Sequence, residues 1–235
     1  MSKIEYAQLF SCVEVQQTFY QPPQITTLER WRGETPAEFE FTIKAWQLIT
    51  HEAKSPTYRR LKKQLSEYEK REVGSFKPGS VVEEAWNVTL SCAEALRAKT
   101  ILFQCPASFK QTKENISNLE RFFSTIKRGS LNFCWEPRGD WDEEIIKRIC
   151  VAFDLSHVVD PFKVRTLTPN HCYFRLHGQT GWRYQYDESE LAELAAMIPN
   201  SGRSYVFFNN VAMVKDAFKF QELISAQRKS RAKEK

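Results

Sequence analysis

Glycine is scarce in this sequence, with 8 residues among 235, and the patterns GxGxxG and GxxxxGK[ST] are absent. Their absence excludes the standard phosphate-binding loops of dinucleotide- and nucleotide-binding proteins. The sequence also has no apolar run near the roughly 18 residues that would span a membrane. Its first residues, Met1 to Tyr6, lack the apolar region of a signal peptide. We therefore expect a cytoplasmic protein without a membrane partner.

Cysteine pairs with the CxxC spacing are absent as well. The six cysteines stand far apart, at positions 12, 92, 105, 134, 150 and 172. This spacing excludes a zinc knuckle and a compact disulfide scaffold. Most of them lie inside apolar segments, such as Phe133-Cys134-Trp135, where a thiol packs as a small hydrophobic group. We expect these cysteines to belong to the core.

Positive charge is in slight excess, with a formal net charge of +5, and it is concentrated in two segments. Residues Lys54 to Arg71 hold seven Lys or Arg against two Glu, and Ser225 to Lys235 hold five against one. Basic segments can contact phosphate groups, although solvated helices and tails are often charged for solubility alone. The charge pattern leaves nucleic acid open as a partner.

Seven short runs rich in Val, Ile, Phe and Tyr are typical of β-strands. They are Cys12–Val15, Phe39–Lys44, Thr100–Gln104, Leu131–Trp135, His157–Asp160, Cys172–Leu176 and Tyr205–Phe208. Amphipathic helical patterns at residues 80–98, 113–126, 141–153 and 188–198 separate most of these runs. This alternation predicts an α/β fold with a largely parallel sheet, either open and doubly wound or closed into a (β/α) barrel.

The predicted chain organisation is one α/β domain over residues 1–224, followed by a basic, disordered tail at residues 225–235. The chain starts with a helical stretch, Lys3–Phe10, and shows no strand before it. A closed barrel normally has eight strands. Either seven strands close this barrel or the first strand is missing.

Each of the seven runs ends with an ionisable or amide side chain. These residues are Glu14 and Gln16, Lys44, Gln104, Glu136 and Arg138, Asp160, Arg175 and His177, and Asn209 and Asn210. In a parallel α/β fold the ligand binds beyond the carboxyl ends of the strands. Such side chains are costly to bury, and their opposite charges can neutralise one another. We predict that they meet in one ligand pocket, with a purely structural salt-bridge network as the alternative.

The same segments resemble the YecE-like proteins, domain-of-unknown-function family seventy-two. The matching stretches are Val13–Tyr20, Phe39–Ala45 with Ile49–His51, Leu102–Pro106, Trp135–Arg138 with Trp141, Val159–Asp160, Tyr173–Gly178 and Phe207–Asn210. The resemblance covers nearly the whole chain. It implies a TIM-type barrel with a site at the matching positions, and it implies no established activity.

The chain departs from this family in two places. Family members usually begin with a strand that carries a Gly-Thr-Ser-Gly-Trp-like motif, which this sequence lacks. In addition, Pro137-Arg138 follows Glu136 where the family often has an aromatic residue before the arginine. The first departure would remove part of the pocket rim, and the second would shift Arg138.

Acid/base catalysis needs titratable groups whose environments differ. The candidates are Glu14, Glu136, Asp160 and His177. The same oxygen-rich set suits Mg²⁺ or Mn²⁺ better than zinc. However, Lys44, Arg138 and Arg175 are predicted to lie beside these groups and to supply the positive charge. The sequence therefore requires no metal or other cofactor, and a divalent metal is the less favoured option.

The three cations favour an anionic ligand, because they can hold a phosphate or a carboxylate. Further candidate binding residues are Thr18, Tyr20, His51, Gln104, Trp141, Asn209 and Asn210. We expect the protein to bind a small anionic or phosphorylated substrate, or to act on it by acid/base chemistry as a hydrolase, lyase or isomerase. The alternative is a nucleic-acid-binding protein that uses the basic segment 54–71, the basic tail and loop aromatics. Substrate and oligomeric state are left open.

Overall fold

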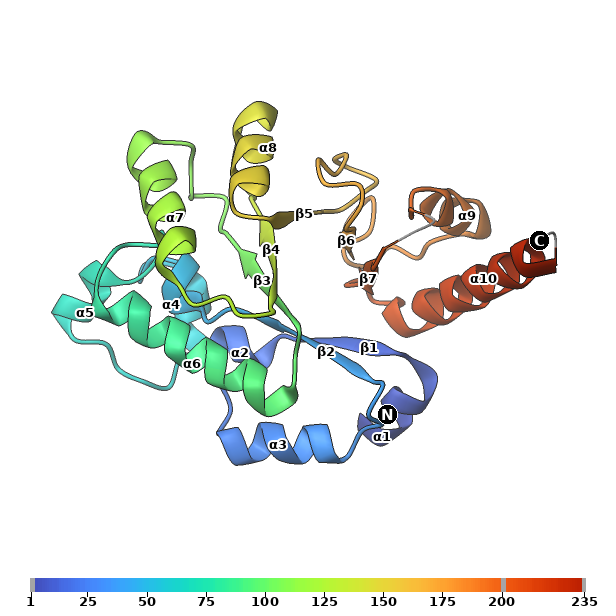
Figure 1. Cartoon of the computed structure of the whole chain (residues 1–235), viewed down its shortest axis with the longest axis horizontal. Coiled ribbons are helices and arrows are strands. Elements are labelled where there is room, and N and C mark those ends of the chain that lie inside the picture. Colours follow the sequence, from blue (N-terminus) through green and yellow to red (C-terminus); the bar gives the residue numbers. More distant parts are fainter. Residues whose placement is uncertain (1–2, 200–201, 234–235) are drawn as a thin grey trace. The chain divides into compact units, whose positions relative to one another are not determined.

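Parallel strands alternate with helices in the structure of this protein, a computed structural model that describes residues 3–199 and 202–233 (Figure 1). The strands are β1 (Cys12–Val15), β2 (Glu40–Lys44), β3 (Thr100–Gln104), β4 (Asn132–Glu136), β5 (Leu155–Val159), β6 (Tyr173–Leu176) and β7 (Tyr205–Phe208). All seven predicted strands are therefore confirmed. The fold is of the predicted α/β class, a TIM-type barrel fold.

The helices follow the predicted positions where the sequence is amphipathic, and several short helices lie between them. They are α1 (Lys3–Leu9), α2 (Gln17–Tyr20), α3 (Ile25–Gly33), α4 (Gln47–Thr50), the 3-10 helix η1 (Pro56–Arg60), α5 (Glu67–Glu72), α6 (Ser80–Leu96), α7 (Lys113–Thr125), α8 (Glu143–Ala152), α9 (Glu188–Ala196) and α10 (Met213–Lys233). Side-chain caps fix the starts of several of them. At α8, for example, the Asp142 carboxylate accepts hydrogen bonds from the backbone N–H groups of Glu144 and Ile145.

The chain divides into two compact units, Met1–Leu155 and Ser156–Lys235. In the first unit, β1 to β4 pair in chain order, and every pair is parallel. The register places Glu14 opposite Thr42 and Gln104 opposite Glu136. Because side chains alternate across a strand, these polar residues lie on one face of the sheet.

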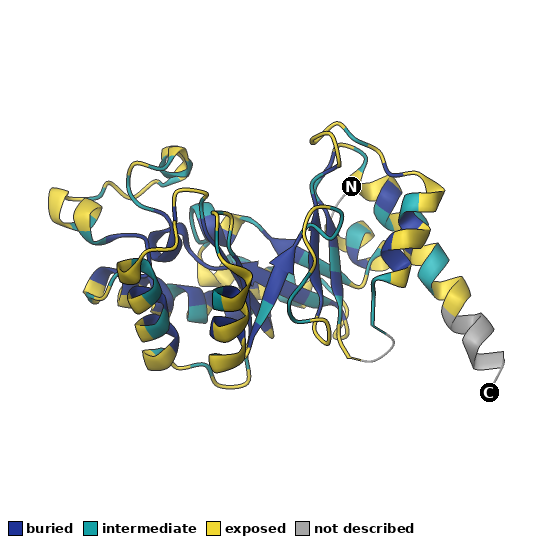
Figure 2. Ribbon diagram, turned by 90° about the horizontal axis from the view of Figure 1, so that it is seen from above, coloured by how far each residue is buried: buried dark blue, intermediate teal, exposed yellow. Residues whose placement is uncertain are grey.

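The other face of these strands forms the aromatic core of the first unit. Phe103 lies 5.3 Å from Phe133 and 5.0 Å from Phe123 of α7, measured between ring centroids. Trp86 of α6 stacks on Phe103 and meets Phe133 edge-on. The strands are accordingly buried, whereas the outer sides of the helices are exposed (Figure 2). Aromatic packing on one face thus leaves the opposite face to the polar residues.

The second unit is likewise a parallel sheet with helices packed against one face, and it has fewer strands. Strands β5, β6 and β7 pair in parallel. Phe174 and Phe208 pack with Leu191 and Leu194 of α9 and with Phe220 of α10. This cluster holds both helices against one face of the three strands.

Helix α10 extends into the segment from residue 225 that the sequence predicts to be a basic, disordered tail. The helix continues to Lys233, because the segment after Phe220 contains no Gly or Pro and is rich in Ala, Gln, Lys and Arg, which favour helices. Residues 234–235, the last of the predicted basic tail, lie outside the described residues, as do the side chains from residue 228 onward. The prediction of a single domain over residues 1–224 stays a prediction.

The cysteines behave as the sequence predicts. None of the six forms a disulfide, and Cys92, Cys105, Cys134, Cys150 and Cys172 are buried. Across the described residues, no helix combines the length and the apolar character that a membrane crossing requires.

Candidate functional site

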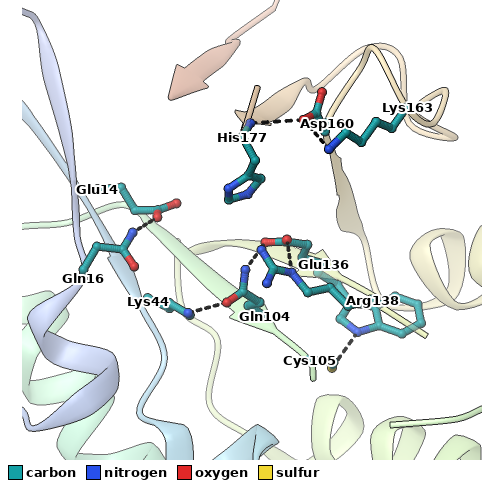
Figure 3. Close-up of polar contacts among 11 residues, drawn as sticks. Glu14, Gln16, Lys44, Gln104, Cys105, Glu136, Arg138, Asp160, Lys163 and His177 are labelled. Carbon is teal, nitrogen blue, oxygen red and sulfur yellow. Dashed lines mark hydrogen bonds and ion pairs between the residues drawn. The ribbon is translucent and has the colours of Figure 1, made fainter. Parts of the chain in front are cut away.

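Three polar side chains at the ends of neighbouring strands form a continuous hydrogen-bonded network. Lys44, Gln104 and Glu136 are the last residues of β2, β3 and β4. The Lys44 ammonium donates a hydrogen bond to the Gln104 carbonyl oxygen. The Gln104 amide then donates to Glu136 Oε2 at 2.7 Å, and Arg138 Nε donates to Glu136 Oε1 at 2.7 Å (Figure 3). The structure thus brings these four predicted residues together at the carboxyl ends of neighbouring strands.

This network is buried. Lys44 is 3% exposed, Gln104 6% and Glu136 7%, whereas the side chain of Arg138 is 42% exposed. Burying charges is costly unless they are paired and hydrogen-bonded. Gln104 meets this requirement because its amide group satisfies a cation on one side and a carboxylate on the other.

Glu14 lies on the same face of the sheet, on β1. Its carboxylate accepts a hydrogen bond from the side-chain amide of Gln16 (Figure 3). The register places Glu14 opposite Thr42, two residues before Lys44 on β2. Two carboxylates, Glu14 and Glu136, and two cations, Lys44 and Arg138, therefore belong to one strand-end cluster in the first unit.

Phe19 links Lys44 to His51. The Lys44 ammonium lies 3.6 Å from the centroid of the Phe19 ring, and His51 packs edge-on against the same ring at 4.8 Å. Thr18 holds this segment in place, because its hydroxyl donates to the backbone carbonyls of Lys44 at 2.7 Å and Val15 at 3.0 Å. Phe19 lies in the matching stretch Val13–Tyr20 and is one of the loop aromatics that could stack on a base or sugar, a role that stays a prediction.

His51 is held in its neutral form. Burial, and then repulsion from Lys44 and Arg138, lowers the pKa of His51 from 6.5 to about 3. The ring Nδ1 lies 2.8 Å from the hydroxyl of Thr50. If Thr50 donates this hydrogen bond, the tautomer with hydrogen on Nε2 is favoured, and His51 is a donor at that atom.

A left-handed turn fixes the backbone of His51. Gly74, Ser75 and Phe76 have φ values of 83°, 52° and 52°, and left-handed backbone is strained for residues other than glycine. Their N–H groups donate to the carbonyls of residues 48, 50 and 49 at the end of α4. A Cβ atom at Gly74 would lie 2.4 Å from the carbonyl carbon of His51. Glycine is therefore needed here for a close approach of two backbone segments.

Tyr20 and Trp141 make contacts that hold loops together. The Arg60 guanidinium lies over the Tyr20 ring at 4.4 Å. The indole N–H of Trp141 donates to the carbonyl of Phe109 at 2.9 Å, and the two rings stack. These contacts account for both aromatics as packing residues, and their role in ligand binding stays a prediction.

In the second unit, Asp160 and His177 follow β5 and β6, as the sequence predicts. Asp160 accepts hydrogen bonds from the backbone N–H groups of His177 at 3.1 Å and Phe162 at 3.3 Å, and it lies 3.9 Å from the Lys163 ammonium (Figure 3). The observed contacts of Asp160 are therefore those of a residue that braces the end of β6. Gly178 supports the same turn, because its φ is 81° and a Cβ atom there would lie 2.2 Å from the Gly181 carbonyl oxygen.

The remaining candidates of the second unit lie on β6 and directly after β7. Arg175 is 3% exposed and pairs in register with Phe207. Asn210 is also buried, and its amide donates to the Tyr184 carbonyl at 2.8 Å and to Asp216 Oδ2 at 2.6 Å. Asn209 contacts the carbonyl of Phe207 at 3.4 Å. Asn210 thus anchors the start of α10, and the prediction that the candidates of both units share one opening stays a prediction.

The described side chains give little support to a metal site. Within residues 3–199 and 202–233, no three His, Cys, Asp or Glu side chains are grouped so that they could hold a metal ion. The two carboxylate oxygens of Glu136 accept hydrogen bonds from Gln104 and Arg138. The groups that the strand-end cluster offers are therefore hydrogen-bonded carboxylates and cations beside a neutral imidazole.

Comparison with known proteins identifies the fold and the family of this chain. Similar solved structures include two crystal structures of a DUF72 family protein from Enterococcus faecalis V583. The first is 23% identical to this chain with a TM-score of 0.71, and the match covers 95% of this chain and 93% of that one. The second is 21% identical with a TM-score of 0.73, and the match covers 96% of this chain and 88% of that one. A DUF72 family protein from Thermotoga maritima MSB8 is 24% identical over 92% of this chain and 85% of that one, with a TM-score of 0.63.

At these identities the solved structures establish the fold alone. No curated protein matches the chain. The sequence profile of the family described as "Protein of unknown function DUF72" matches residues 4–235. This match extends over nearly the whole length, in agreement with the resemblance seen in the sequence, and the chain belongs to the DUF72 family.

Proposed function

We propose that this protein binds a small anionic ligand, a phosphorylated or carboxylated metabolite, at the strand-end cluster of the first unit. The observation that carries the proposal is the convergence of two cations on one network, since Lys44 is held by Gln104 and Arg138 by Glu136, and Gln104 and Glu136 are hydrogen-bonded to each other. Burial, and then the charges of Lys44 and Arg138, lowers the pKa of the neighbouring His51. Cations that converge on a water-poor site are suited to holding phosphate or carboxylate groups.

The roles of the residues follow from their contacts. Lys44 is fixed by Gln104 and by the Phe19 ring, so that its charge is presented without a loss of side-chain entropy on binding. Arg138 is half-exposed and supplies a second cation. His51 donates from Nε2 to the ligand. Glu136 and Glu14 are the candidate acid/base groups, as the sequence predicts, should the bound metabolite react.

Binding of inorganic phosphate, measured by calorimetry, tests the proposal. Lys44→Met and Arg138→Met should each weaken phosphate binding by about tenfold, the loss of one charge-assisted hydrogen bond. Lys110→Met is the matched control, because Lys110 is an exposed cation paired with Asp140 outside the cluster. Arg138→Met keeps the test valid if Lys44→Met impairs folding. Equal phosphate affinity in wild type and in Arg138→Met would refute the assignment.

A screen of phosphorylated and carboxylated metabolites by thermal shift would then identify the ligand. If one of them is turned over, Glu136→Gln should abolish turnover and retain binding, because it removes the ionisable group and keeps the size of the side chain. Turnover that survives in both Glu136→Gln and Glu14→Gln would exclude the carboxylates as acid/base groups.

The contacts of the basic segment give less support to the alternative function, nucleic-acid binding. In the basic segment 54–71, Lys54, Lys63 and Lys70 form ion pairs with Glu52, Glu69 and Glu67, which reduces the field of the segment. A titration with generic DNA and RNA at increasing salt decides this alternative, because binding through phosphate contacts weakens steeply with salt.

A further inference from the structure

A cleft of the first unit is lined by residues of α6 and α7 and of the segment that precedes α6. Its volume is about 350 Å³, within the range of small-molecule sites. It shares no lining residue with the strand-end cluster. It is therefore a separate feature of the same unit.

The floor of this cleft is apolar and rigid. Trp86 and Phe122 line it, are 4% and 6% exposed, and meet edge-on at 6.2 Å between ring centroids. Phe76 also lines the cleft and packs against Phe122 at 5.2 Å between ring centroids. Val82 lies beside them in the floor. Because these rings are fixed by one another and by the core aromatics, the floor is preformed for an aromatic group.

The rim of the cleft is cationic. Lys77, Arg121 and Lys127 line it together with one carboxylate, Glu83. Arg121 and Lys127 are exposed, and neither forms an ion pair with any residue that the structure describes. An apolar floor below unpaired cations complements a molecule with an aromatic body and an anionic end.

We infer that this cleft binds a small aromatic anion, a ring system that carries a carboxylate or sulfonate. The ring inserts against Trp86 and Phe122, and the acid group lies at the rim between Arg121 and Lys127. Desolvation of the ring supplies affinity, and the two cations select for negative charge. The inference does not depend on the proposed function at the strand ends.

Titration with 2-naphthoate, followed by calorimetry and by the indole N–H resonance of Trp86 in NMR, tests the inference. Arg121→Glu should weaken 2-naphthoate binding by about tenfold, because it replaces an attractive charge by a repulsive one. Lys147→Glu, the same charge reversal at an exposed position of α8, should leave the affinity unchanged. The neutral analogue 2-naphthylmethanol should bind more weakly than 2-naphthoate by a similar factor.

A second pair of variants tests the location by filling the cleft. Thr125 is exposed and lines the cleft, whereas its neighbour Ser124 is exposed and does not. Thr125→Trp should abolish 2-naphthoate binding, and Ser124→Trp should not. The inference is overturned if 2-naphthoate does not bind at millimolar concentration, or if the members of each variant pair bind it equally. Loss of binding in Lys44→Met with none in Thr125→Trp would also overturn it and would place the naphthoate at the strand ends.

Discussion

Replacing Gln104 by leucine removes the amide that joins Lys44 to Glu136. The substitution keeps the approximate size of the side chain and deletes two hydrogen bonds to charged groups, one from the Lys44 ammonium and one to Glu136 Oε2 at 2.7 Å. All three side chains are less than a tenth exposed, so that solvent does not replace the lost partner freely. The charges of Lys44 and Glu136 would then be less well compensated.

The magnitude follows from the partners that remain. Hydrogen bonds to buried charged groups contribute about 1.5–3 kcal/mol each. Lys44 keeps its contact with the Phe19 ring, and Glu136 keeps Arg138, while the leucine adds a small amount of apolar burial. We therefore expect Gln104→Leu to lower the free energy of unfolding by about 3 kcal/mol, at the lower end of the sum of the two bonds.

Urea denaturation, monitored in parallel by circular dichroism and tryptophan fluorescence, measures this loss. Coincident transitions are needed for a single free energy of unfolding, because the chain has two compact units. The control is Gln64→Leu, since Gln64 is exposed, and its cost should stay within about 0.5 kcal/mol. A loss below about 1 kcal/mol for Gln104→Leu would show that the bridging amide does not hold the charges together, contrary to our reasoning.

Three further predictions concern pH, backbone and thiols. The pKa of His51 is about 3 in the folded protein, whereas its ordinary value is 6.5. Below pH 6.5 the unfolded chain therefore binds a proton at His51 that the folded protein does not bind. The stabilisation present above pH 6.5 should consequently be lost as the pH falls toward 3, at up to about 1.4 kcal/mol per pH unit. His51→Gln should flatten this dependence in urea titrations at several pH values; an unchanged slope would contradict it. Gly178→Ala should destabilise the protein by about 2 kcal/mol or more, whereas Gly129→Ala, where nothing lies within 4 Å of the added Cβ, should cost less in the same assay. Burial raises the pKa of the Cys105 thiol to about 12, so a disulfide reagent should modify Cys105 only after unfolding; rapid modification of the native protein, mapped by mass spectrometry, would disprove this burial.

The sequence contained most of the information about strands and strand ends. Apolar runs bounded by polar residues identified all seven strands, and the residue after each run identified Lys44, Gln104 and Glu136 as neighbours. This worked because parallel strands bring their carboxyl ends to one edge, so that chain position translates directly into proximity. The resemblance to the YecE-like proteins led to the same family that the sequence profile identifies.

Other features could not be read from the sequence, for identifiable physical reasons. Helix α3 lacks a clear apolar stripe, since Leu28 is its buried residue, and periodicity therefore gave no signal there. The bracing roles of Asp160 and Asn210 depend on backbone groups from other segments, which sequence patterns do not reveal. The prediction for the tail used only its position at the end of the chain, and helix α10 extends into it as far as Lys233.

The turn at Gly74, Ser75 and Phe76 has a consequence for how this chain can vary in length. Its three amides are tied to the carbonyls that end α4, so the connection from α4 to Phe76 has a fixed geometry at its far end even though it contains neither strand nor long helix. An inserted residue at the turn would break this tie and displace the imidazole of His51. Insertions and deletions are therefore more easily accommodated at the exposed residues 62–64 of the same connection, where the chain can bulge outward without moving the imidazole.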